Sequence, residues 1–159
     1  MDRDTKLLKS AAENAKKAAE LAKERTLALK EEAKSAVYEA TVAKESIKHA
    51  RSDADDAKEK AYRARIQAIE YKEAAKLAKL DRRNTTDADA KASYYDAYAK
   101  KTKKAADDAK KLVKEAIEIA KCSENAAKLS KELAKCALAS TREAKKEAML
   151  LSKAYKAAK

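Results

Sequence analysis

Glycine, proline, phenylalanine and tryptophan are all absent from this chain of 159 residues. An average soluble protein contains about 7% glycine and about 5% proline, so the absence of both is a strong bias. Sheet proteins need turns with positive φ, and phosphate-binding loops need a backbone without Cβ, and glycine normally supplies both. The composition therefore excludes most sandwich, barrel and doubly wound folds, and it indicates an all-α protein of few, long helices.

Long apolar runs are also missing. No stretch of 18 consecutive apolar residues occurs, so we expect no membrane-spanning helix. No apolar stretch follows residues 1–4, so we expect no signal peptide in this chain.

Alanine and charged residues make up most of what is present. The chain has 40 alanines, 42% charged residues and a net charge of +12 from 39 basic and 27 acidic side chains. Burying a methyl group removes little apolar surface at about 25 cal/mol per Å², so stability must come from many repeated contacts.

A heptad repeat of small residues organises both halves. Alternate steps of four and three residues from Leu8 to Ala78 reach 21 positions, of which 20 are apolar and Thr26 is the exception. The same walk from Ala88 to Ala158 again reaches mostly small residues. This 3.5-residue period predicts left-handed supercoiling of closely packed helices.

The two stripes lose phase between residues 81 and 89, near the midpoint of the chain. Thr86 with Asp89 three residues later is typical of a capped helix start. We therefore predict a long antiparallel helical hairpin, a coiled-coil bundle forming a single elongated domain over 1–159. Its first arm spans about 5–81, its turn about 82–87 and its second arm about 88–158, with arms roughly 110 Å long at 1.5 Å per residue.

Charge changes near Ser52 and Ser123 allow an alternative, a single-chain four-helix bundle with breaks at these two serines. The heptad crosses both sites without a phase slip, and neither has a glycine to turn on, so we favour the hairpin.

Larger apolar residues flank the stripe and suggest that one hairpin does not bury all of its apolar surface. We expect self-association, as a homodimer of hairpins. The flanking residues are Val37, Val42, Ile66, Ile69, Leu77, Leu80, Leu112, Ile117, Ile119, Leu129, Leu133, Leu138 and Leu150.

Two features mark the region of the turn. Asn84 begins an Asn-Thr-Thr sequon, which would accept a glycan on an exposed secreted loop, although Asn and Thr are also ordinary turn and cap residues. Tyrosines follow and precede the turn, and they predict either an aromatic recognition patch at the tip or aromatic filling where helices separate. They are Tyr71, Tyr94, Tyr95 and Tyr98, with Tyr71 and Tyr98 roughly level in a hairpin centred near residue 84.

Cys122 and Cys136 lie two heptads apart on one helical face, about 21 Å along a straight helix. That separation is too long for a disulfide along a straight helix, so pairing would need a partner chain or a reversal of the chain between the two residues. We expect instead two small buried thiols beside the seam.

Catalytic chemistry is not expected. His49 is the sole histidine and has no nucleophile or carboxylate at defined spacing, so a solvated or helix-capping role is the simpler interpretation. We expect no enzyme activity, no cofactor, no metal site and no small-molecule substrate.

The basic excess suggests a second class of function, a helical binding module for an anionic partner such as nucleic acid, lipid headgroups or a glycosaminoglycan. Acidic residues are interspersed throughout, and residues 100–104 form the only basic block of note. A mixed-charge, solvated surface is the simpler interpretation.

The alanine seam surrounded by Lys, Glu and Asp, as in Ala33–Ala40 and Ala105–Ala109, resembles the alanine-rich helical-bundle coat proteins of trypanosomes. The alanine heptads of malaria merozoite surface proteins are similar too. The resemblance implies a non-catalytic structural or surface protein, a surface antigen at the cell surface or outside the cell, that forms a rigid helical rod and shields or presents surface. A cytoplasmic location is the alternative, and those coats tend to be acidic, whereas this chain is basic.

Overall fold

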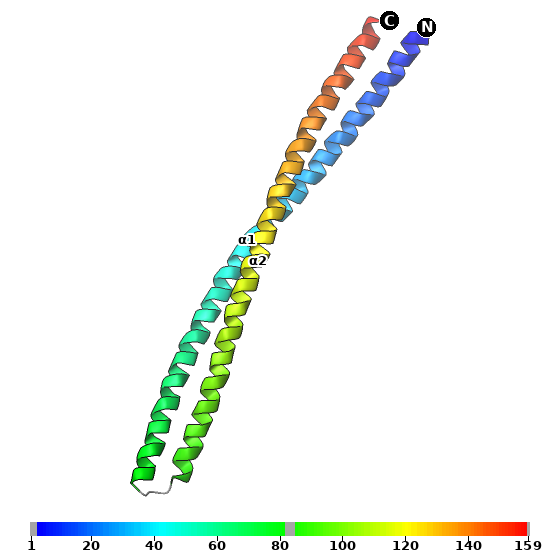
Figure 1. The fold of residues 1–159 in the computed structure, drawn as a ribbon. Coiled ribbons are helices and arrows are strands. Elements are labelled where there is room, and N and C mark those ends of the chain that lie inside the picture. Colours follow the sequence, from blue (N-terminus) through cyan, green and yellow to red (C-terminus); the bar gives the residue numbers. More distant parts are fainter. Residues whose placement is uncertain (1–2, 82–84, 159) are drawn as a thin grey trace. The chain divides into compact units, whose positions relative to one another are not determined.

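The computed structural model describes residues 3–81 and 85–158 and contains two long helices, α1 (Arg3–Leu80) and α2 (Thr86–Ala157). They comprise 78 and 72 residues, and no strand occurs in the described part of the chain. The helices run antiparallel and pack against each other as a hairpin (Figure 1). The all-α hairpin predicted from the heptad repeat is confirmed.

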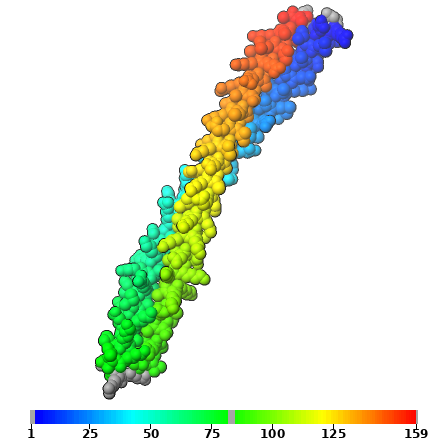
Figure 2. Space-filling model, viewed as in Figure 1, coloured from blue at the N-terminus to red at the C-terminus, as the bar shows by residue number. Residues whose placement is uncertain are grey.

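Contacts divide the hairpin into two units. Unit 1 comprises Met1–Thr41 and Lys121–Lys159, and unit 2 comprises Val42–Ala120. Each unit pairs one segment of α1 with one segment of α2, and within each the two helices touch side to side (Figure 2).

The heptad stripe forms the contact surface between the helices. All 21 positions from Leu8 to Ala78 are buried or half-buried, and in the second walk only Ala158 is exposed. Because the stripe returns to the same helical face every seven residues, a partner helix can cover it in both units.

Small side chains alone form the buried core. Its hydrophobic members are twelve alanines, and no large side chain is fully buried. Leucine, isoleucine and tyrosine side chains lie instead on the outer faces, where seventeen large hydrophobic residues are exposed. Alanine at the contact lets two helices approach closely, at the cost of leaving larger groups outside.

The register of the two helices is the same in both units. Thr26 pairs with Thr141 in unit 1, and Tyr71 pairs with Tyr95 and Lys79 with Asp89 in unit 2. The midpoint of each pair lies between residues 83 and 84. A short turn can therefore join the helices without any shift in the repeat.

Thr26, the one polar position in the first stripe, is among the most buried residues at 4% exposure. Its hydroxyl lies 2.8 Å from that of Thr141, which is also 4% exposed, and both hydroxyls lie 2.9 Å from the carbonyl oxygen of Ala22. The Thr141 hydroxyl is also 2.9 Å from the carbonyl oxygen of Ala137. These bonds satisfy the two buried hydroxyls. The one polar residue of the first stripe, Thr26, therefore forms a contact between the helices.

The helix ends agree with the predicted arms to within two residues. The amide of Asp89 donates to the carbonyl of Thr85 at 2.8 Å, so Thr85 precedes the first helical residue, Thr86. Asp87 and Asp89 lie in the first turn of α2 and Lys79 lies in the last turn of α1, as the helix dipole favours.

The alternative four-helix bundle is wrong. Helix α1 continues through Ser52 and α2 continues through Ser123. A change in the sign of charge does not interrupt backbone hydrogen bonding, and neither site has a glycine or proline to end a helix.

Candidate functional site

Four tyrosines gather in unit 2, eight to twelve residues from the helix ends at Leu80 and Thr86. The rings of Tyr71 and Tyr95 stack across the two helices, with centroids 4.1 Å apart and planes 4° from parallel. Tyr94 meets Tyr95 edge to face at 5.2 Å and lies parallel to Tyr98 at 6.5 Å. The structure therefore brings together all four predicted tyrosines, although Tyr71 contacts Tyr95 and not Tyr98.

The tyrosine stack belongs mainly to the contact between helices. Tyr71, Tyr95 and Tyr98 are half-buried, whereas Tyr94 is 65% exposed. Hydrogen bonding to Tyr71, followed by the nearby phenol charge and partial burial, raises the pKa of Tyr95 above its ordinary value. Three of the rings thus fill space between helices, and Tyr94 alone offers a largely open aromatic surface.

Ion pairs connect the helices beside this cluster. Asp96 accepts from Lys72 at 2.6 Å across the helices and from Lys100 at 2.9 Å along α2. Hydrogen bonds from Lys72 and then Lys100 lower the pKa of the Asp96 carboxyl, because both favour its charged form.

A shallow groove next to these pairs is lined by three cationic side chains, Tyr62, the Asp96 carboxylate and two alanines. Its volume is about 300 Å³, and it lies between Tyr62 and Arg65 of α1 and Lys100 and Lys103 of α2. Within residues 3–81 and 85–158, no carboxylate forms an ion pair with Arg65 or Lys103. Among the described residues, the groove therefore holds one cation from each helix without an ion pair, beside the Asp96 carboxylate that pairs with Lys72 and Lys100.

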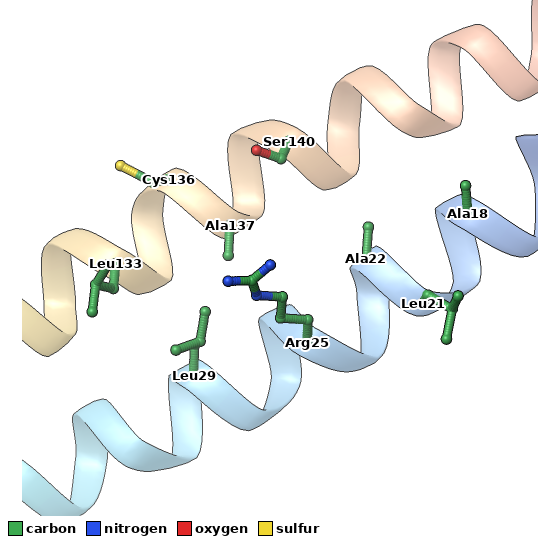
Figure 3. Close-up of a pocket in the computed structure, with 9 residues that line it drawn as sticks. All are labelled: Ala18, Leu21, Ala22, Arg25, Leu29, Leu133, Cys136, Ala137 and Ser140. Atoms are coloured by element: carbon green, nitrogen blue, oxygen red, sulfur yellow. The ribbon is translucent and has the colours of Figure 1, made fainter.

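Unit 1 carries an apolar groove between its two helices, with a volume of about 510 Å³. Figure 3 shows Leu133 and Cys136 on α2 and Leu21 and Leu29 on α1 at its edges, with the Arg25 side chain extending across it towards α2. Leu21 is 66% exposed and Leu133 is 57% exposed. The groove is therefore an open apolar surface with one cation inside it.

Cys122 and Cys136 are free and exposed, so the expectation of buried thiols beside the seam is wrong. Each cysteine precedes a stripe position, Ser123 or Ala137, by one residue, so its side chain lies about 100° around the helix from the contact face. Exposure keeps the predicted intermolecular disulfide compatible with the structure.

The remaining residues that the sequence singled out do not form a site among the described residues. Asn84 lies outside the described residues, and His49 is exposed on α1. In the described part of the chain, no group of three metal-ligating side chains occurs, and neither helix has a segment apolar enough to cross a membrane.

One feature was missed by the sequence reasoning, which treated the flanking leucines and the cysteines separately. Four-three steps from Cys122 reach Ala126, Leu129, Leu133 and Cys136, and all five side chains are exposed. We call these five residues the outer strip. A second heptad walk, started from Cys122 instead of from the alanines, would have found it.

Comparisons with protein-family models, with curated proteins and with solved structures give no match for this chain.

Proposed function

We propose that this protein is a non-catalytic structural element, a helical hairpin that associates with neighbouring hairpins to build or cover a surface. The resemblance to alanine-rich coat proteins makes the cell surface the location that we propose. The contact between α1 and α2 supplies rigidity, and the outer faces supply the association.

The inverted distribution of apolar side chains carries this proposal. Alanine occupies the interior, whereas the exposed set includes Leu21, Leu129, Leu133, Ile69 and Leu77, each between 47% and 67% exposed. A protein that works as an isolated monomer rarely leaves so many large apolar groups in water, and contiguous exposed apolar surface marks interaction sites. The hairpin is therefore best understood as a component of an assembly.

Sedimentation of the whole chain tests the proposal. We expect reversible self-association at protein concentrations of about 100 µM. The association should strengthen in ammonium sulfate, because salt screens the repulsion between chains of charge +12 and favours apolar burial. A chain that stays monomeric under both conditions contradicts the proposal.

The cationic groove of unit 2 supports a second candidate function, binding of an anionic polymer. Arg65 and Lys103 come from different helices and line the same groove as Tyr62. A polyanion could contact both cations at once, and its affinity would fall as salt rises.

Charge reversal in the groove tests this second function with heparin as the probe. We expect Arg65→Glu with Lys103→Glu to weaken heparin binding about tenfold, because unpaired cations of the groove make direct contacts. The control, Lys16→Glu with Lys17→Glu, changes the net charge equally on exposed positions of unit 1 and should weaken binding about twofold. Equal losses in the two variants would assign heparin binding to diffuse charge and remove the groove as a site.

A further inference from the structure

The outer strip gives α2 of unit 1 a second apolar face. The strip residues follow the spacing four, three, four and three, which is the spacing of a coiled-coil seam. Leu129 is 67% exposed and Leu133 is 57% exposed, whereas Ala127 and Ala134, which face α1, are 7% and 8% exposed. The same helix segment therefore carries one seam that α1 covers and another that none of the described residues covers.

The heptad spacing restricts what can cover the strip. A seam with a 3.5-residue period packs best on a helix with the same period, because knobs then meet holes at every turn. A second copy of this chain supplies such a helix, since its own outer strip has the same spacing and exposure. The adjoining groove adds Leu21 and Leu29 of α1 to the surface that an incoming helix would contact.

Alignment of both thiols together with the apolar strip residues requires a parallel pair. In a parallel pair, each strip residue meets its own copy: Leu129 on Leu129, Leu133 on Leu133, and each cysteine on the same cysteine. An antiparallel pair that brings Cys122 to Cys136 instead sets Leu133 against Asn125 and Ala126 against Glu132. Only the parallel register aligns both thiols and keeps the apolar residues together.

We propose that two copies of this chain dimerise in parallel through the outer strip, residues 122–136 of α2, with Cys122 and Cys136 each facing its counterpart. This inference rests on the proposed function and names the surface and partner by which hairpins associate. In the dimer the like thiols lie within reach of a disulfide, which requires Cα atoms about 4.4–6.8 Å apart.

Variants at two matched leucines test the surface. We expect Leu133→Glu to raise the dimer dissociation constant about 100-fold in sedimentation equilibrium, because two carboxylates meet in a desolvated seam. Leu27→Glu is the control, because Leu27 is 54% exposed against 57% for Leu133 and lies outside the groove lining. Leu27→Glu should change the dimer dissociation constant by less than about threefold. Circular dichroism of both variants verifies that the helices are intact.

Oxidation with diamide tests the register. Diamide accepts two electrons and two protons from a pair of thiols as the S–S bond forms. We expect Cys122–Cys122 and Cys136–Cys136 linked peptides by mass spectrometry, and none from the Leu133→Glu variant at the same concentration.

The outcomes separate this inference from the proposed function. A wild-type dimer that Leu133→Glu leaves unchanged, or that yields Cys122–Cys136 peptides, overturns the parallel outer-strip dimer and keeps self-association. A chain that is monomeric at about 100 µM overturns both.

Discussion

Ala75→Leu is expected to destabilise the hairpin by about 1–3 kcal/mol, with loss of helix packing in unit 2. Ala75 is 5% exposed and lies in the alanine stripe between Tyr71 and Ala78. Three additional carbons cannot fit at a contact made by methyl groups, so the helices must move apart and neighbouring alanines lose their contacts. The effect opposes the slightly favourable helix propensity of leucine, which is close to that of alanine.

Urea denaturation followed by circular dichroism at 222 nm measures this loss. The matched control is Ala74→Leu, because Ala74 is adjacent on the same helix but exposed. We expect the control to change the unfolding free energy by less than about 0.5 kcal/mol. Equal destabilisation by both variants would show that the stripe does not limit helix approach.

Removal of one hydroxyl from the Thr26–Thr141 contact is expected to destabilise the hairpin by about 1 kcal/mol. Thr141 lies within 2.9 Å of the Ala22 carbonyl on the other helix, so Thr141→Val removes bonds between helices and not only a local bond. Valine has nearly the same shape as threonine, so this substitution removes the hydroxyl while the side-chain packing stays the same. Thr41→Val is the control, because the exposed Thr41 hydroxyl bonds only Val37, at 3.0 Å in its own helix.

A double-mutant cycle over Thr26→Val and Thr141→Val resolves the contact between the two hydroxyls. We expect the double variant to lose less than the sum of the single variants, by about 0.5–1 kcal/mol, because the two groups share one hydrogen-bonded cluster. Strict additivity would mean that each hydroxyl acts only on its nearby carbonyl.

The sequence predicted the contact surface almost completely because a heptad is a local property. Each step of four or three residues returns to one face of a helix, so the positions from Leu8 to Ala78 could be assigned before any partner was known. The absence of glycine and proline likewise favoured continuous helix over breaks at Ser52 and Ser123, and the structure confirms that both helices continue through these serines.

The positions of the individual side chains of the candidate site were less predictable. Cys122 and Cys136 were expected to be small buried thiols beside the seam, but both are exposed, because each lies one residue before a seam position and therefore on a neighbouring face of the helix. Thr26 was an exception within the stripe, and its importance depends on Thr141, which is 115 residues away. The unpaired charge of Arg65 and Lys103 also depends on which groups of the second helix lie opposite.

The sequence by itself determined that this protein is helical, which face of each helix is covered and where the chain turns. These properties follow from residues within a few turns of one another, through helix propensity and the 3.5-residue period. The tertiary structure alone decided the register of α1 on α2, the pairing of Thr26 with Thr141, and the exposure of a second apolar seam on α2. Each of these depends on groups that lie far apart in the chain, and their contacts exist only when the two helices meet.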